Sequence, residues 1–247
     1  MEGAAPIIYP VKPLPKPKPK KILHDHLPDL PCIMTLVAPT KSGKSVLLNN
    51  LILRDDFYKD VHDNITIMSN TIEQDETSRF LRKACDCYTG YDDNVLAGIV
   101  QQQKAFDDDE RPFIGLIFDD ILGSVKRSSY LNHLVTRSRH YGIGLLAISV
   151  QSFKAVGPTI RNNTNAFICM NLQNMSELSK ISDEYSGMFG GDDNFRKIYA
   201  KATEQRYNFL YLDLQNNPAR AFRNFEEQLA EGEKLLFGGD VKNNVPE

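Results

Sequence analysis

Short apolar runs alternate along this chain with stretches whose apolar residues recur at helical spacing. The apolar runs, which have the length of buried strands, are residues 32–37, 64–69, 113–118, 143–150 and 166–171. The stretches that predict helices are residues 46–53, 73–84, 94–106, 128–137, 175–185 and 194–203. Strands that are apolar on both faces and alternate with helices predict an α/β fold, with a mostly parallel central sheet and helices on both faces.

The two ends of the chain differ from this regular middle. Residues 1–30 form a basic arm in which proline alternates with lysine, a composition that favours extended polyproline II structure. The arm either touches DNA, a neighbouring subunit or another viral or cellular surface, or is a solvated tail. Residues 206–214 predict a strand that suits a sheet edge, and residues 226–247 predict a glutamate-rich helix and tail. The predicted domain therefore spans residues 31–225.

Charge and cysteine content narrow the class of protein. The chain has 247 residues and a formal net charge of −3, so no overall basic field indicates nucleic acid binding. Any contact with DNA must use local patches or an oligomeric ring. The cysteines lack a metal-binding spacing and predict reduced, mostly buried thiols. Because no apolar run approaches the length of a membrane span and the N-terminal residues lack the apolar segment of a signal peptide, we expect a soluble intracellular protein without a membrane span.

The residues after the first predicted strand carry the strongest chemical signal. They read Ala-Pro-Thr-Lys-Ser-Gly-Lys-Ser between a strand and a helix, which is the setting of a phosphate-binding loop. Lys44 would reach the β- and γ-phosphates, and Ser45 would ligate Mg²⁺. Ala38 replaces the usual first glycine and disfavours a positive φ. The predicted nucleotide-binding residues are Ala38, Pro39, Thr40, Lys41, Ser42, Gly43, Lys44, Ser45 and Val46.

Two later strands end in polar residues that fit the same chemistry. Asp119 and Asp120 end one of them, and Gln151 ends the next. Asp119 fits the acid that holds Mg²⁺, and Asp120 fits a general base that polarises the attacking water. Gln151 could orient water near the γ-phosphate. The acidic run at residues 107–110 instead indicates a solvated loop, because metal ligands must converge in space.

The strand pattern and three arginines extend this interpretation. An extra strand between the loop strand and the Asp119 strand, with a second acid beside the first, is typical of the additional-strand class of P-loop NTPases. Arg137, Arg139 and Arg161 are candidates for an arginine finger that stabilises transition-state charge on a neighbour's nucleotide. For each of the three, a surface arginine is the alternative.

Residues 38–45, 116–120, 136–140, 149–152, 160–163 and 209–213 occur in an order and at a spacing that resemble one known superfamily. It is the FtsK/HerA superfamily, and within it the genome-packaging ATPases of poxviruses, other nucleocytoplasmic large DNA viruses and virophages. The resemblance implies a RecA-like ATPase, in a pentameric or hexameric ring, that uses ATP and Mg²⁺ to pump double-stranded DNA into a preformed capsid. It assigns Lys44 and Ser45 to the nucleotide and Mg²⁺, and Asp119 to Mg²⁺. It assigns Asp120 to the water and Gln151 to the γ-phosphate.

The resemblance also implies partners and a location. The partners are double-stranded DNA, held by non-specific contacts to its backbone, and a capsid, portal or membrane protein of the virion. The location is the viral factory in the host cell cytoplasm, with the virion as a second place. Asp120 stands where many members of the superfamily carry glutamate.

Two other interpretations of the sequence stay open. One is a nucleotide-binding structural or regulatory P-loop protein with little turnover. The other is a DNA-independent P-loop NTPase such as a small kinase or GTPase, although the chain lacks the Asn-Lys-x-Asp motif of guanine-specific enzymes.

Overall fold

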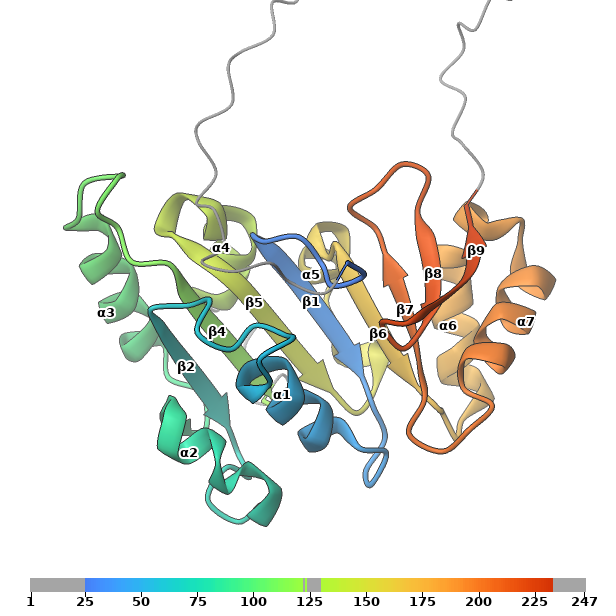
Figure 1. Cartoon of the computed structure of the whole chain (residues 1–247), viewed down its shortest axis with the longest axis horizontal. Coiled ribbons are helices and arrows are strands. Elements are labelled where there is room, and N and C mark those ends of the chain that lie inside the picture. The colour runs from blue at the N-terminus through green and yellow to red at the C-terminus, as the bar shows by residue number, and fades with distance from the viewer. Residues whose placement is uncertain (1–24, 122, 124–129, 233–247) are drawn as a thin grey trace, which may run out of the picture.

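A computed structural model describes residues 25–121, 123 and 130–232 of the chain. Most of the predicted basic arm, the first two residues of the helix predicted over 128–137, and the predicted tail from residue 233 onward lie outside the described residues. The described chain folds around one large sheet with helices on both of its faces (Figure 1). The predicted α/β class is therefore confirmed.

The sheet has nine strands in the order β3-β2-β4-β5-β1-β6-β7-β8-β9. Strands from β3 to β6 in this order run parallel, and β7, β8 and β9 add antiparallel to the β6 side. The strands are β1 (Cys32–Val37), β2 (Asn64–Ser69), β3 (Asp86–Thr89), β4 (Ile114–Asp119), β5 (Ile143–Val150), β6 (Ala166–Met170), β7 (Phe209–Asp213), β8 (Arg220–Arg223) and β9 (Glu227–Glu231).

The helices divide between the two faces of the sheet because each strand presents apolar side chains to both. In β1, Ile33 and Val37 belong to the core under α3 to α7, whereas Met34 and Leu36 belong to the core under α1 and α2. The helices are α1 (Lys44–Leu53), α2 (Leu81–Ala84), α3 (Asp93–Lys104), α4 (Tyr130–Arg137), α5 (Pro158–Asn163), α6 (Met175–Tyr185) and α7 (Asp192–Ala202).

Strand β5 lies between β1 and β4, which is the additional-strand arrangement that the sequence predicted. The register aligns Val37 of β1 with Val150 of β5, and Asp119 of β4 with Ser149 of β5. The parallel strands therefore end together at one edge of the sheet, which we call the carboxyl edge. Their starts define the opposite amino edge. The loop after β1 and the polar ends of β4 and β5 all meet at the carboxyl edge.

The C-terminal third departs from the prediction in two places. Strand β7 is buried along its whole length between β6 and β8, so its assignment to a sheet edge was wrong. Its apolar side chains serve both cores, with Leu210 and Leu212 on one face and Phe209 and Tyr211 on the other. The glutamate-rich helix predicted after residue 225 is also wrong for Glu227–Glu231, which form β9. The open edge of β8 supplies backbone partners there, and pairing overrides helix propensity.

Two further differences lie near β2. Strand β3 had no prediction because its four residues alternate polar and apolar side chains only weakly. The helix predicted over 73–84 is a 3₁₀ turn at Glu76–Arg79 followed by the single turn of α2. Asp75 caps that turn through the Thr77 N–H at 2.9 Å, and the apolar residue Phe80 is 51% exposed.

The cysteines of the described chain are all free thiols, as predicted. Burial raises the pKa of Cys32 and Cys169 far above the ordinary value, so these thiols stay protonated and unreactive. No helix in the ranges that the structure describes is both long and apolar enough to cross a membrane.

Candidate nucleotide-binding site

The loop after β1 has the backbone of a phosphate-binding loop. Gly43 has a φ of 102°, a left-handed conformation that glycine adopts without steric cost. Ala38 is fully buried and has no positive φ, so its replacement of glycine causes no backbone strain. Lys41 instead adopts the positive φ of 63°. The Ser42 hydroxyl and N–H both donate to the Pro39 carbonyl, at 2.6 and 3.3 Å, and close the loop.

The start of α1 leaves its backbone donors available for a ligand. No side chain caps this helix, and its first turn contains no acidic residue. The first N–H groups of a helix have no partner within the helix, and the helix dipole gives that end a partial positive charge. The N-terminus of α1 is therefore a ready anion site, and it opens onto a cavity of about 860 Å³.

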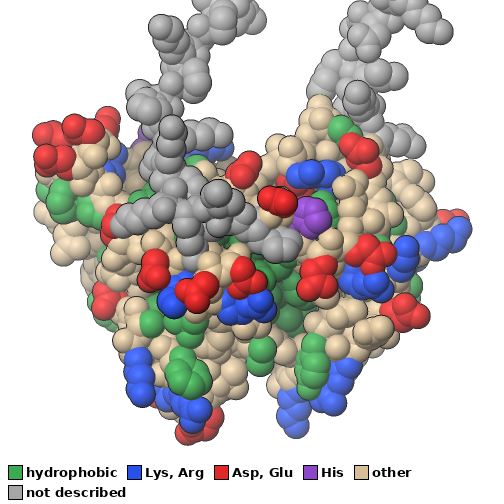
Figure 2. Space-filling view, viewed as in Figure 1, with side chains coloured by type: hydrophobic (Ala, Val, Ile, Leu, Met, Phe, Trp, Pro, Cys, Tyr) green, Lys and Arg blue, Asp and Glu red, His purple; other side chains and the backbone are tan. Residues whose placement is uncertain are grey.

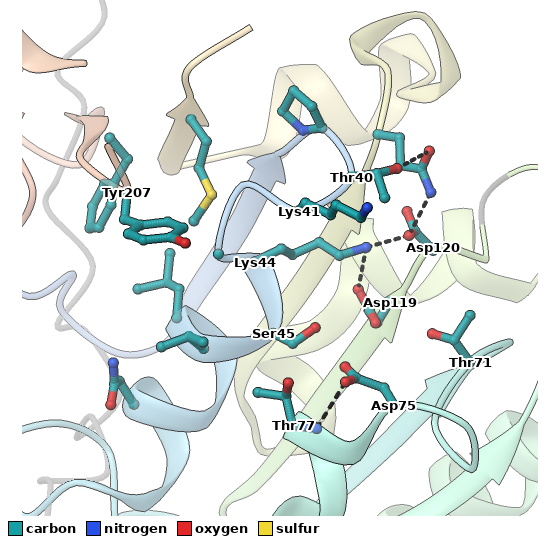
Figure 3. A pocket seen from close by; sticks show the side chains of 18 of the residues that line it. Thr40, Lys41, Lys44, Ser45, Thr71, Asp75, Thr77, Asp119, Asp120 and Tyr207 are labelled. Atoms are coloured by element: carbon teal, nitrogen blue, oxygen red, sulfur yellow. Dashed lines mark hydrogen bonds and ion pairs between the residues drawn. The ribbon is translucent and has the colours of Figure 1, made fainter. Parts of the chain in front are cut away.

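Lys44 and two carboxylates form the charged centre of that cavity. The Lys44 Nζ lies 3.1 Å from Asp119 Oδ1 and also contacts Asp120 Oδ2 directly. Figure 3 shows the lysine reaching from the start of α1 across to both acids. The side chains are 12 to 17% exposed, so this contact is shielded from water on most sides. The ammonium group contacts both acids and offsets part of their negative charge, near the place that a phosphate would occupy.

Asp119 is held in a fixed orientation by hydroxyl groups from the neighbouring strands. Ser149 of β5 donates to Oδ1 at 2.7 Å, and Ser69 of β2 donates to Oδ2 at 3.2 Å. Asp119 and Ser45 both line the cavity and offer the hard oxygen donors that Mg²⁺ prefers. These two residues therefore fit a Mg²⁺ ion that takes its remaining ligands from phosphate and water. No cluster of three or more acids, histidines or cysteines suited to a metal occurs in the described residues.

Asp120 has a strained backbone and a network of polar contacts. Its φ is 54°, in the left-handed region. The Asn70 amide donates to its carbonyl at 3.1 Å, and the Gln151 amide donates to its Oδ2 at 3.0 Å. Thr40 of the loop donates in turn to Gln151 Oε1 at 3.4 Å. The structure thus brings together Lys44, Asp119, Asp120 and Gln151, as expected for a loop and strand ends that share one edge of a parallel sheet.

Sequence reasoning missed the side of the cavity formed by the loop after β2. Thr71, Gln74, Asp75 and Thr77 line it. Partial burial disfavours the charged form of Asp75, but hydrogen bonds from Ser45 and from the 3₁₀ turn outweigh that cost and lower its pKa. The sequence signal for this side of the cavity was the polar run Ser69-Asn70-Thr71 at the end of β2. Strand β2 lies beside β4, the strand that ends in Asp119.

The three candidate arginines lie far from this cavity within the same chain. Arg137 and Arg139 come just before β5 and so lie at the amino edge, whereas Arg161 lies in α5, between the end of β5 and the start of β6, with its guanidinium over the Phe153 ring. Arg161 is paired with Glu184 at 2.6 Å. None of these three described residues lines the nucleotide cavity. An arginine finger from this set could therefore act only on a neighbouring subunit.

The sheet order, the loop and the acids at the carboxyl edge define an additional-strand P-loop NTPase fold. No protein-family model matches the chain. A relative, the uncharacterized protein 088R of Invertebrate iridescent virus 3, is 25% identical over 182 residues, which is 72% of this chain and 67% of the relative.

Solved structures share the fold at low sequence identity. The genome-packaging NTPase B204 of Sulfolobus turreted icosahedral virus 2, in complex with AMP, has a TM-score of 0.55 at 20% identity and covers 85% of this chain and 98% of its own. The cytoplasmic domain of the type VII secretion ATPase EccC of Thermomonospora curvata has a TM-score of 0.53 at 13% identity, over 81% of this chain and 27% of its own. The predicted resemblance to viral packaging ATPases is confirmed at the level of the fold.

Proposed function

We propose that this chain is an ATP-driven double-stranded DNA translocase that packages a viral genome into a preformed capsid. The observation that carries the proposal is the convergence of Lys44, Asp119, Asp120 and Gln151 on one cavity at the uncapped start of α1. The shared fold with the B204 packaging NTPase and the similarity to an iridescent virus protein support a viral role. The compartment we propose is the viral factory of the host cytoplasm, with the virion as a second location.

The geometry suggests which step of ATP hydrolysis each residue would serve. The N–H groups at the start of α1 would hold the phosphates, and Ser45 and Asp119 would hold Mg²⁺, which supplies charge neutralisation when bound. Phosphate oxygens would compete for the Lys44 ammonium, which now contacts Asp120. Nucleotide binding would therefore release Asp120 to accept a proton from the attacking water. Gln151, already bonded to Asp120, would orient that water.

DNA would be held by an assembly rather than by one broad basic surface. On the face that Figure 2 shows, lysine and arginine side chains are interspersed with aspartate and glutamate. A pentameric or hexameric ring could still gather local basic groups around a central channel, where contacts to the DNA backbone need no sequence specificity. The position of Arg137 and Arg139 at the amino edge supports such a ring, because a neighbour could present them to the nucleotide. A capsid, portal or membrane protein of the virion would dock the ring.

The test is ATP hydrolysis by the purified protein with and without double-stranded DNA, together with a mass measurement of the assembly. We expect DNA to stimulate hydrolysis in a species of ring size. Lys44→Ala and Asp120→Asn should each lower the rate by roughly 100-fold or more, because one removes the cation at the phosphates and the other the base. Lys59→Ala is the matched control, since this surface lysine pairs with the exposed Asp55 outside the cavity.

Other outcomes would favour the alternatives. Hydrolysis that is robust and indifferent to DNA would indicate a DNA-independent P-loop NTPase. A monomer that binds ATP without turning it over would indicate a structural or regulatory nucleotide-binding protein. Full activity of the Lys44→Ala variant would contradict both the site and the proposed function.

A further inference from the structure

The nucleotide cavity has a second end with a different chemistry. Away from the lysine and the acids, it is lined by Val46, Met170, Tyr207 and Phe209. Val46 and Tyr207 are 53 and 54% exposed, although both side chains are apolar or aromatic. In Figure 3, Tyr207 lies on the far side of the phosphate loop from Asp120. Because Gly43 to Ser45 fix the phosphate end of a nucleotide, its sugar and base must extend toward this apolar end.

Tyr207 has a backbone conformation that its side chain disfavours. The Asn208 N–H donates to the Gln205 carbonyl at 3.1 Å, which closes a turn with Tyr207 as its third residue. The φ of Tyr207 is 72°, a value that favours glycine at this position of a turn and is rare for an aromatic residue. A bulky side chain that persists in strained backbone suggests a function for that side chain.

The neighbouring residues explain how the strain is maintained. The Phe209 N–H donates to the Asn224 side chain at 3.2 Å, and the Asn224 N–H donates to the Phe209 carbonyl at 3.0 Å. The Asn224 amide also contacts the Asn208 side chain at 3.3 Å. These contacts fix the chain immediately after Tyr207.

The ring of Tyr207 rests directly on the phosphate loop. A Cβ added at Gly43 would lie 3.0 Å from its Cδ1 atom. The Arg206 guanidinium lies 4.6 Å from the centroid of the same ring. A cation over an aromatic ring adds a weak attraction that favours this ring orientation, and Tyr207 remains 54% exposed, which leaves room for a planar ligand. The tyrosine ring therefore lies against Gly43, at the place where a bound nucleotide would leave the loop.

We propose that Tyr207 is the stacking platform for the nucleotide base, and that the site accepts adenine and guanine nucleotides with similar affinity. The inference rests on the proposed binding of a nucleotide triphosphate in this cavity. Stacking depends on the π surface of a base and not on its hydrogen-bond pattern. Asn50 also lines the cavity, and its amide can donate or accept and so matches either purine.

The test compares Tyr207→Gly, Tyr207→Phe and the wild type by calorimetric binding of ADP, GDP and inorganic tripolyphosphate, with the melting temperature of each protein. Tyr207→Gly should weaken ADP and GDP binding roughly tenfold and leave tripolyphosphate binding unchanged, because only the base loses a contact. Its melting temperature should stay equal or rise, since glycine relieves the strained φ. Tyr207→Phe should keep the wild-type affinity. Tyr88→Gly is the control, because Tyr88 is an exposed tyrosine outside the cavity.

Each contrary result has a distinct meaning. Equal ADP affinity of the wild type and Tyr207→Gly, with tripolyphosphate still bound, would overturn the stacking role alone. A Tyr207→Gly protein that melts lower and loses all three ligands equally would indicate a structural residue. Strong preference for ADP over GDP in the wild type would overturn the lack of base selectivity. A wild-type protein that binds neither ADP nor tripolyphosphate would overturn the proposed function and the stacking role together.

Discussion

At the scale of single residues, burial changes the charge state of the His62 side chain in acid. It is 9% exposed, and neither ring nitrogen has a hydrogen-bond partner among the described residues. Its ring stacks on Phe113 with centroids 5.3 Å apart and planes 4° from parallel. Loss of hydration disfavours the imidazolium and lowers its pKa to about 4, although Asp63 acts in the opposite direction.

This shift predicts loss of stability in acid. The folded pKa lies below the unfolded value near 6.5, so the unfolded chain binds more protons between about pH 6.5 and about pH 4. The contribution of neutral His62 to the free energy of unfolding is complete above about pH 6.5 and is lost as the pH falls from about 6.5 to about 4. His62 should account for about 2 kcal/mol of the free energy of unfolding lost between about pH 7.5 and about pH 5 in urea titrations. A His62→Phe variant with the same loss as the wild type would contradict this assignment.

At the scale of elements, the buried carboxylate of Asp213 stabilises the hairpin of β7 and β8 through hydrogen bonds. Asp213 is 4% exposed and accepts hydrogen bonds from Arg220 at 2.6 and 3.1 Å, from the Asn216 amide at 2.7 Å and from the Gln215 N–H at 3.1 Å. These donors come from the connection between the strands and from the start of β8. The carboxylate therefore fixes how β8, and with it β9, joins the sheet.

Removing the cation of this pair should destabilise the fold. Arg220→Met leaves a buried carboxylate without its charged partner, and we expect a loss of about 2 kcal/mol in the free energy of unfolding. The double variant Asp213→Asn with Arg220→Met should recover part of that loss, because it removes the uncompensated charge. Arg196→Met is the control, since its partner Asp192 is half exposed and such surface pairs contribute less than about 1 kcal/mol. Chemical denaturation of the four proteins gives the comparison, and equal losses for Arg220→Met and Arg196→Met would count against the argument.

At the scale of the whole molecule, the two edges of the sheet have different functions in the proposed ring. Lys44 and the acids lie at the carboxyl edge, and Arg137 and Arg139 lie exposed at the amino edge. A six-residue strand separates the edges by about 20 Å, which an arginine side chain cannot bridge. The arginines can reach a nucleotide only across an interface between subunits.

Mixing inactive variants tests this arrangement. Lys44→Ala and the double variant Arg137→Ala with Arg139→Ala should each hydrolyse ATP slowly on their own. In an equal mixture, about a quarter of the interfaces would combine an intact lysine with an intact arginine pair from the neighbour, so activity should return in part. Lys44→Ala mixed with Asp120→Asn provides the control, because both lesions lie at the carboxyl edge and the arginines are intact in each. Full activity of the arginine variant alone would exclude these two residues as the trans finger.

Sequence alone determined the local parts of this protein. The apolar runs predicted β1, β2, β4, β5 and β6, because a strand buried on both faces must be apolar throughout. The loop composition predicted the anion site at the start of α1, because glycine and small polar residues allow the required turn. The strands and the phosphate loop depend on residues that are adjacent in the chain, so both can be predicted from the sequence without knowledge of the tertiary structure.

The specific contacts between distant segments became visible in the tertiary structure. Three contacts join segments that are far apart in the sequence. They are the ion pair of Lys44 with Asp120, the hydrogen bond from Gln151 to Asp120, and the contact of the Tyr207 ring with Gly43. The same holds for β9, whose glutamates form a strand because β8 offers an open edge. Residue pattern fixes which face of an element is buried, but strand pairing and side-chain convergence depend on the whole set of competing contacts, which no local stretch contains.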